Sequence, residues 1–307
     1  MKIAVMGAGG VGGYYGGVLA KYGEDVTLVC RGAHRDDVLK NGLKVKSHWG
    51  DFTVKVKATA DPSDAGPFDL ILHCVKLYHN AAALPLLKAA VGPKTAILTV
   101  QNGVTSGEII AAQYGWERVL QGATYIEAAQ PSPGHVEQSG STARIEFGER
   151  DGKRSPRVDA IEKVLSKPGI QVQVSENIVG SLWAKLVSVG SIGTCMTVSR
   201  ANLPEVLASA EGENTIRTVM EEIVAVGRAH GIKFKSGLVD ERIAGVKPEA
   251  ADFKSSLQFD LEHGRPLELD DLLGAVVRKG RDKGIPVPAS AALVMALQAF
   301  TRGAPKA

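Results

Sequence analysis

The chain opens with the stretch Lys2-Ile-Ala-Val-Met-Gly-Ala-Gly-Gly-Val-Gly12, a short apolar run that leads into a glycine-rich turn. The run Lys2–Met6 predicts a buried strand, and Gly10–Tyr22 predicts a helix that ends at Gly23. The β-branched run Asp25–Cys30 predicts the next strand. The first 30 residues or so therefore form one strand–helix–strand unit.

The turn Gly7-Ala8-Gly9-Gly10-Val11-Gly12 has the pattern GxGxxG between a strand and a helix. In this position Gly7 permits a tight turn, Gly9 lets the backbone approach a pyrophosphate, and Gly12 allows close helix–sheet packing. The free N–H groups and the positive end of the helix then hold the phosphates. We predict that Gly7, Gly9, Gly10, Val11 and Gly12 bind a dinucleotide, the alternative being a glycine-rich turn without a ligand.

The end of the second strand indicates which dinucleotide binds. An NAD enzyme places Asp or Glu there to hold the ribose 2′-hydroxyl, whereas this strand ends in Cys30-Arg31-Gly32. Arg31 can grip a 2′-phosphate with its planar guanidinium group. We therefore predict NADP(H) as the cofactor; otherwise Arg31 is a solvated surface charge.

The length of 307 residues predicts two domains. Strands alternate with helices as far as about residue 176, which predicts an α/β, mostly parallel sheet of Rossmann type in residues 1–176. Residues 177–307 predict an all-α domain. The further predicted strands are Leu43–Lys46, Phe52–Lys57, Leu70–Val75, Thr95–Val100 and Val119–Ile126, with a hairpin made of His135–Glu137 and Ala143–Phe147. The further predicted helices are Ala81–Ala90, Ser106–Tyr114, Asn177–Ser199, Leu203–His230, Lys235–Ala244, Pro248–Glu262, Pro266–Lys283 and Ala289–Arg302.

Charge and cysteine content exclude several classes. The net charge is +3, with no long run of Lys or Arg, which argues against a nucleic-acid-binding protein. Three cysteines without CxxC spacing predict reduced thiols and neither a disulfide framework nor a zinc site. We expect a soluble, cytoplasmic protein without a metal site. The residue spacing leaves a homodimer open.

Lys185 stands alone in an apolar stretch, because it is the only charged residue between Glu176 and Arg200. Such a lysine either extends along the helix to solvent or faces a polar cleft. Burial lowers the pKa of a lysine towards the range useful for proton transfer. Glu268 lies in Pro266-Leu267-Glu268-Leu269-Asp270-Asp271, where acids in a first helical turn are ordinary. The pair Glu221-Glu222 predicts a solvated helix face.

The order and spacing of several motifs resemble the ketopantoate reductase (2-dehydropantoate 2-reductase) family over essentially the whole chain. The matching segments are the glycine loop, Arg31, Val75-Lys76, Gln101-Asn102-Gly103, Leu182-Trp183-Ala184-Lys185-Leu186, Ser255-Ser256, Gly264-Arg265-Pro266-Leu267-Glu268-Leu269-Asp270 and Gly284-Ile285-Pro286-Val287-Pro288. The resemblance implies a C-terminal helical domain like that of 6-phosphogluconate dehydrogenase. It also implies reduction of a small 2-keto acid by NADPH, in pantothenate biosynthesis.

The resemblance also implies roles for single residues. Lys185 matches the general acid that protonates the oxygen of the reduced ketone, and Glu268 matches the acid that orients the substrate. Ser256 matches a substrate-binding serine. Asn102 and Lys76 match residues that line the junction between cofactor and substrate.

Three positions depart from the family pattern. Val189, Gly193 and Leu273 stand where the family usually has asparagines, two of which bind the pantoyl part of the substrate. Losing these hydrogen-bonding groups makes the pocket more apolar, so that the substrate is either ketopantoate or a less polar 2-keto acid. Two other functions remain open: a related opine-type or β-hydroxyacid enzyme, and a catalytically silent NADP(H)-binding sensor.

Overall fold

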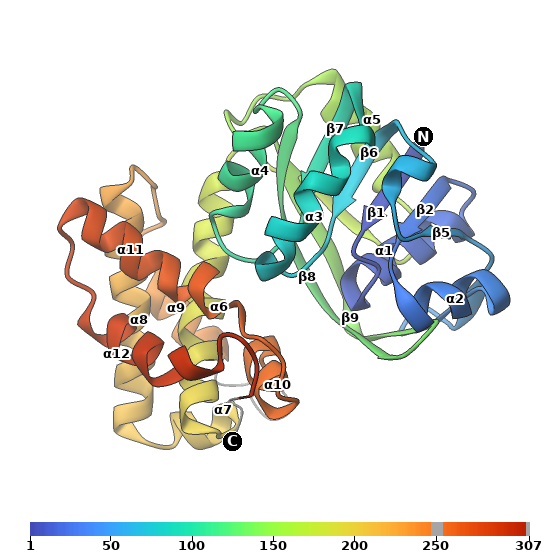
Figure 1. Ribbon diagram of the computed structural model, residues 1–307. Coiled ribbons are helices and arrows are strands. Elements are labelled where there is room, and N and C mark those ends of the chain that lie inside the picture. The colour runs from blue at the N-terminus through green and yellow to red at the C-terminus, as the bar shows by residue number, and fades with distance from the viewer. Residues whose placement is uncertain (247–253, 305–307) are drawn as a thin grey trace. The chain divides into compact units, whose positions relative to one another are not determined.

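The computed structural model describes residues 1–246 and 254–304. The chain divides into two compact units (Figure 1). Unit 1 contains Met1–Asn102 and Ser106–Ile178, and unit 2 contains Gly103–Thr105 together with the chain from Val179 onwards. Unit 1 is a parallel-dominated sheet covered by helices and unit 2 is helical, which confirms the predicted fold class.

Unit 1 is built on one ten-stranded sheet with the strand order β4-β3-β9-β8-β7-β6-β1-β2-β5, to which β10 adds beside β9. The strands are β1 (Lys2–Met6), β2 (Asp25–Val29), β3 (Leu43–Ser47), β4 (Phe52–Val54), β5 (Lys57–Thr59), β6 (Phe68–His73), β7 (Val91–Thr99), β8 (Val119–Ser132), β9 (His135–Gly148) and β10 (Gln171–Val174). The central order β7-β6-β1-β2 is parallel throughout. The carboxyl ends of these four strands therefore lie at one edge of the sheet.

Side-chain alternation along these strands builds a core on each face of the sheet. In β1, Ile3 and Val5 join one core while Ala4 and Met6 join the other. The first core includes side chains of α1 (Gly10–Lys21) and α5 (Pro156–Leu165). The second includes side chains of α3 (Asn80–Leu86) and α4 (Ser106–Tyr114), which lie over one face of the sheet in Figure 1. The sheet is thus buried on both sides, as parallel sheets are.

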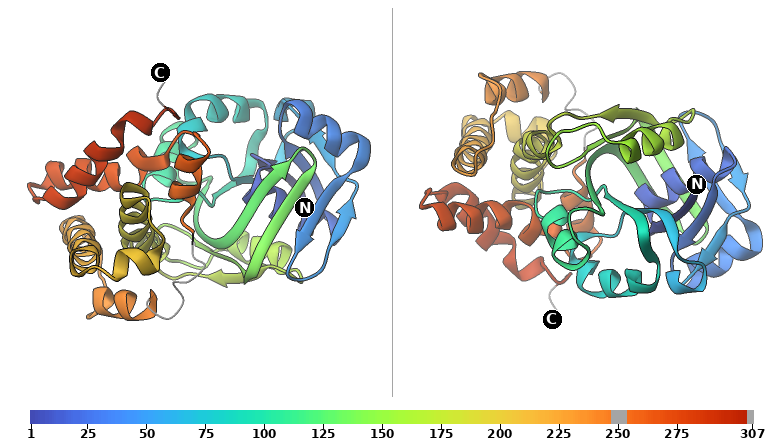
Figure 2. Two further views of the ribbon diagram at one scale, coloured as in Figure 1. Left: turned by 90° about the horizontal axis from the view of Figure 1, so that it is seen from below. Right: turned by 90° about the horizontal axis from the view of Figure 1, so that it is seen from above.

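The predicted hairpin within residues 135–147 is wrong. Residues His135–Gly148 form the single long strand β9, which pairs antiparallel with β8, and the two strands are seen side by side in green in Figure 2. The turn lies earlier, at Gly134, whose φ is +66°. The strand contains a bulge at residues 140–142, because Ile126 pairs with Ala143 but the next residue, Glu127, pairs with Ser139.

The predicted strand Phe52–Lys57 is also wrong, because it divides into two. Residues Phe52–Val54 pair antiparallel with β3, and Lys57–Thr59 pair parallel with β2. The two short strands, β4 and β5, therefore lie at opposite edges of the sheet.

Unit 2 is a set of helices. They are α6 (Ile178–Ser199), α7 (Leu203–Leu207), α8 (Ala210–Ala229), α9 (Leu238–Val246), α10 (Ser256–Glu262), α11 (Leu273–Lys283) and α12 (Pro288–Leu297), with 3₁₀ turns η5 (Glu268–Asp271) and η6 (Gln298–Phe300). Part of the predicted helix Pro248–Glu262 lies outside the described residues. Helix α6 is long and apolar enough to cross a membrane by length and composition, but 61% of its most apolar window is buried in the protein, as in the core helix of a soluble fold.

Two of the predicted long helices are interrupted. Leu203–His230 divides into α7 and α8, because Ser209 adopts an extended conformation and caps α8 by accepting the N–H of Gly212. Pro266–Lys283 divides into η5 and α11 at Leu272, whose φ and ψ of −97° and −100° are not helical. Both interruptions begin a new helical segment with its own N-terminus.

Glu222 is buried, contrary to the predicted solvated face. Its carboxylate accepts the backbone N–H groups of Ala289 and Ser290 at 2.9 and 2.7 Å and the Ser290 hydroxyl at 2.5 Å. A carboxylate from α8 thus accepts hydrogen bonds from free N–H groups at the start of α12. Its negative charge also interacts favourably with the positive end of the helix dipole. Glu221, its neighbour, is exposed as predicted.

Candidate active site

The glycine loop joins β1 to α1 by a close backbone approach. Gly7 has a φ of +93°, and a Cβ at Gly12 would lie 2.1 Å from the carbonyl oxygen of Gly7. A Cβ at Gly10 would lie 2.4 Å from the carbonyl oxygen of Ala128 in β8. Gly12 and Gly10 are therefore required by packing within unit 1, independently of any ligand.

Gly9 differs from its neighbours, because a Cβ there would meet no atom within 4 Å. It is the N-cap of α1, a helix with no side-chain cap and no acidic residue in its first turn. The first N–H groups of α1, those of Gly10 and Val11 included, are thus left without a capping side chain. Open space beside a bare helix N-terminus fits a pyrophosphate.

The other predicted cofactor residues of unit 1 follow the neighbouring parallel strands. Arg31 comes after β2, Lys76 after β6 and Asn102 after β7, while the glycine loop comes after β1. Because β7, β6, β1 and β2 are adjacent and parallel, the structure brings these residues to the same edge of the sheet. Ligands of open α/β sheets bind at this edge.

Arg31 is the exposed cation at the end of β2. It occupies the N-cap position of α2 (Gly32–Asn41), with no acidic residue in the first turn of that helix. The nearby Arg35 donates to Asp36 at 2.7 and 2.9 Å. His34 is buried, and its Nδ1 accepts the N–H of Gly134 at 2.9 Å. Of the three basic side chains, Arg31 is the one best suited to a 2′-phosphate.

In unit 2, Lys185 is half-buried and is the sole charged residue of the 22-residue helix α6. Val189 and Gly193 follow it at intervals of four residues and so share its face of the helix. Val189 is half-buried and Gly193 is buried. The face that carries the lysine thus has no hydrogen-bonding side chain at the next two positions.

Glu268 is a buried carboxylate, 6% exposed, at the first position of η5. Burial raises the pKa of Asp271 in the same turn; Arg278 opposes this shift, and the charges of Glu268 and Asp270 add to it. Ordinary helix-start acids are exposed, so the burial of Glu268 is the feature that the sequence pattern did not show. Leu273, fully buried, follows two residues after this turn.

Ser255 is a residue that sequence reasoning missed. It is 6% exposed, caps α10 by accepting the N–H of Gln258 at 3.0 Å, and donates to the carbonyl oxygen of Gly193 at 3.4 Å. A Cβ at Gly193 would lie 3.4 Å from the Cβ of Ser255. Ser256 is exposed at the first position of α10, and its substrate-binding role stays a prediction. The helix-capping pattern of a serine before an apolar helix was the available signal for Ser255.

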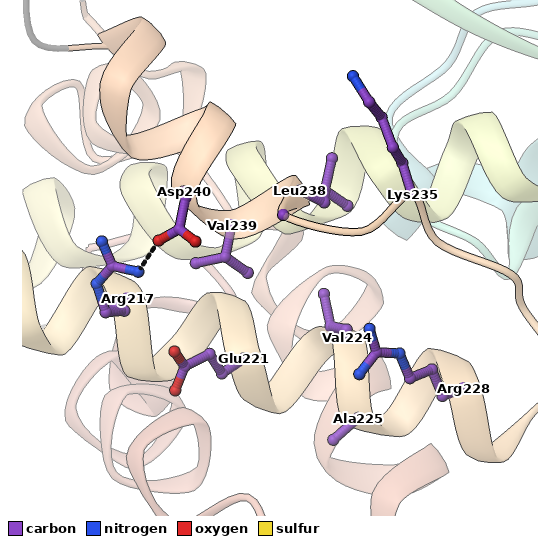
Figure 3. A pocket seen from close by; sticks show the side chains of 10 residues that line it. Arg217, Glu221, Val224, Ala225, Arg228, Lys235, Leu238, Val239 and Asp240 are labelled. Atoms are coloured by element: carbon purple, nitrogen blue, oxygen red, sulfur yellow. Dashed lines mark hydrogen bonds and ion pairs between the residues drawn. The ribbon is translucent and has the colours of Figure 1, made fainter.

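A surface pocket of unit 2 lies elsewhere, between α8 and α9 (Figure 3). It is lined by Arg217, Glu221, Val224, Ala225, Arg228, Lys235, Gly237, Leu238, Val239 and Asp240. None of the predicted site residues lines it. Its Arg217 and Asp240 pair with each other at 2.6 Å, as the dashed line in Figure 3 marks.

Comparison with known proteins covers both units. The family model "Ketopantoate reductase PanE/ApbA" matches residues 3–152, and the model of its C-terminal domain matches residues 177–301. The chain is 32% identical to the 2-dehydropantoate 2-reductase of Mesorhizobium japonicum, over 94% of each chain. It is similar to the crystal structure of a ketopantoate reductase from Ralstonia eutropha JMP134, with a TM-score of 0.91, 31% identity and 98% of each chain covered.

The bare helix N-terminus and the parallel sheet together define a dinucleotide-binding protein. The chain belongs to the ketopantoate reductase family, as the matches to both of its domain models show. Members of this family are oxidoreductases that use NADPH. The open space at Gly9 and the exposed Arg31 fit such a cofactor.

Two glycine substitutions separate packing from cofactor binding. We expect Gly9→Ala to leave the free energy of unfolding within about 0.5 kcal/mol of wild type, because its Cβ meets nothing, and to weaken NADPH binding about tenfold. Gly12→Ala should destabilise the fold by about 1–3 kcal/mol through its contact with Gly7. Chemical denaturation and fluorescence titration with NADPH measure both effects. Normal NADPH affinity in Gly9→Ala would contradict the assignment of the loop.

Proposed function

We propose that the chain reduces a 2-keto acid to a 2-hydroxy acid with NADPH, in the manner of a 2-dehydropantoate 2-reductase. The observation that carries the proposal is that Lys185 is the sole charged residue of α6. A relative of the chain is named 2-dehydropantoate 2-reductase, which supports the same reaction. NADPH supplies the hydride that reaches the ketone carbon. The residues of the chain then have to bind the acid, hold the ketone oxygen and supply one proton.

Lys185 is proposed as the general acid. As the ketone carbon accepts hydride, negative charge develops on its oxygen, and a positioned donor stabilises that charge and transfers a proton to it. An ammonium group on a half-buried, apolar helix face is less shielded by water than a surface lysine, which strengthens its effect on the oxygen.

Glu268 is proposed to orient the substrate. Its carboxylate is 6% exposed and accepts hydrogen bonds only, so it suits a hydroxyl or ammonium partner. We assign Lys76 and Asn102 to the junction of cofactor and substrate, and Ser256 to the substrate. Asn102 can both donate and accept, whereas Lys76 can hold a carboxylate.

Replacing Lys185 tests the acid assignment. We expect Lys185→Ala to lower kcat about 10²- to 10⁴-fold, the usual contribution of a general acid, while the Kd of NADPH stays unchanged. Stopped-flow absorbance at the NADPH band measures the first and fluorescence titration the second. Lys283→Ala, which removes an exposed lysine at the end of α11, serves as the matched control. A near-normal kcat for Lys185→Ala would show that another group supplies the proton.

Arg31 is proposed to select NADPH over NADH. We expect Arg31→Ala to reduce the preference for NADPH, measured as the ratio of the two kcat/KM values, about 10- to 100-fold, because a charge-assisted contact to the 2′-phosphate is lost. Arg35→Ala, which removes a guanidinium already paired with Asp36, should leave the ratio unchanged. An unaltered ratio in Arg31→Ala would transfer the selection to another residue.

A less polar substrate than ketopantoate is the second candidate. Val189, Gly193 and Leu273 carry no hydrogen-bonding side chain, and Ser255 rather than an amide lies against Gly193. A site built to bind a substrate hydroxyl gains much of its discrimination from that bond. Without such partners, the hydroxyl of ketopantoate contributes little to binding.

A panel of 2-keto acids separates the two candidates. If the pocket is apolar, simple branched 2-keto acids should match or exceed ketopantoate in kcat/KM, and Gly193→Asn should shift the ratio towards ketopantoate. A Cβ at position 193 meets Ser255 only at ordinary contact distance, so we expect the variant to fold, which circular dichroism and thermal unfolding measure. Ketopantoate far ahead of the other acids would refute the less polar substrate. No NADPH oxidation with any acid would favour an NADP(H)-binding sensor.

A further inference from the structure

The loops that follow β6 and β7 share a buried polar network centred on Gln101. The Gln101 side chain is 6% exposed. The network also contains His73, Asn80, Thr99 and Ser106, each at most 4% exposed. All of these residues belong to unit 1. A buried polar group must find partners inside the protein, so each bond of this network constrains the backbone that carries it.

The amide of Gln101 uses its full hydrogen-bonding capacity. Its Nε2 donates to the carbonyl oxygen of Val75 at 2.7 Å and to Oδ1 of Asn80 at 2.8 Å. Its Oε1 accepts the hydroxyl of Ser106 at 2.6 Å, and the Thr99 hydroxyl at 3.2 Å and Nδ2 of Asn80 at 3.4 Å also donate to it. Two donors and two acceptor positions are all that a glutamine amide has. The side chain is therefore held in one orientation.

His73 joins the network through a hydrogen bond to Asn80. Its Nε2 lies 2.9 Å from Oδ1 of Asn80, an atom that only accepts, so Nε2 carries the hydrogen. Burial lowers the pKa of His73 to about 4, against which the bond to Asn80 acts weakly. The ring is thus a neutral, fixed donor at neutral pH, and it orients Asn80 for Gln101.

The position of Gln101 in the chain gives this network a consequence at the site. The paired ladder of β6 and β7 ends at His73 and Thr99. Past that point the Gln101 side chain donates a hydrogen bond to the carbonyl oxygen of Val75, the residue before Lys76. The residue that follows Gln101 in the chain is Asn102. One amide therefore fixes the spacing of the two loops after the ladder has ended.

We propose that Gln101 is a positioning residue, which holds Lys76 and Asn102 at the spacing that the reaction requires. The inference rests on the proposed function, because it takes the roles of those two residues from there. The phosphates are assigned to the glycine loop and the 2′-phosphate to Arg31, so disturbing Gln101 should affect the reacting end of the cofactor more than its affinity.

The substitution Gln101→Met tests the proposal, because methionine keeps the length and bulk of the side chain but makes none of the hydrogen bonds of the amide. We expect kcat with the best 2-keto acid of the panel to fall about 10- to 100-fold, the cost of a small misplacement of reacting groups, while the Kd of NADPH changes less than about threefold. Activity is expressed per folded molecule, so that a loss of stability is not counted.

Gln121→Met is the matched control. Gln121 is 4% exposed in β8, opposite Thr99, and its Oε1 has no partner among the residues that the structure describes. Removing it should change kcat less than about twofold. Equal losses in the two variants, or a kcat for Gln101→Met within about twofold of wild type, would overturn the positioning role.

Hydrogen exchange tests the same role without turnover. In the free protein, the backbone amides of residues 74–79 and 100–104 should exchange faster in Gln101→Met than in wild type, and those of β1 should not. Unchanged exchange in both loops would refute the inference. A wild-type protein that oxidises no NADPH with any acid would instead count against the proposed function, since the exchange result does not depend on the reaction.

Discussion

The close approach of helix α1 to strand β1 is the constraint on which the nucleotide-binding unit depends. No side chain fits between Gly12 and the carbonyl oxygen of Gly7, and none fits between Gly10 and β8. The helix therefore starts close to the end of the strand, and its first N–H groups have no side chain to cap them. The order of the parallel strands then places the ends of β2, β6 and β7 beside that point. The packing of α1 against β1 thus determines where the N-terminus of the helix lies relative to the other predicted cofactor residues of the unit.

Unit 2 buries charged groups at few of its described positions. Helix α6 carries no charge along its 22 residues except that of Lys185, and the turn at Glu268 buries a carboxylate beside Asp271. Burying a charge costs free energy unless a partner compensates it. The third such place, Glu222, has a structural reason, because three hydrogen bonds from the start of α12 surround it. The burial of Glu222 is therefore explained by the packing of α12, whereas the role of Glu268 stays a proposal.

The sequence predicted the fold class and most elements, because helices and strands with one apolar face have a period that local sequence displays. The failures occurred where a distant partner decides. Polar residues 138–141 have the composition of a turn, but β8 pairs with residues 138 and 139 and resumes pairing at Ala143, so that residues 140–142 form a bulge within one strand. The sequence around Glu222 is typical of a solvated helix face, but α12 packs there and its N–H groups bind the carboxylate. At the site, the glycine loop and Lys185 were visible as patterns, whereas the contact of Ser255 with Gly193 joins residues 62 positions apart and leaves no local trace.

The hydrogen bond between His34 and the turn of the β8–β9 hairpin has a consequence for cofactor choice. Since a backbone N–H can only donate, Nδ1 of His34 must be unprotonated, and burial lowers the pKa of the ring further. The imidazole of His34, three residues after Arg31, is therefore neutral and adds no positive charge for a 2′-phosphate. The positive charge at this end of β2 comes from guanidinium groups, which do not titrate in proteins. The charge that the protein presents at this end of the strand therefore does not change with pH in the physiological range.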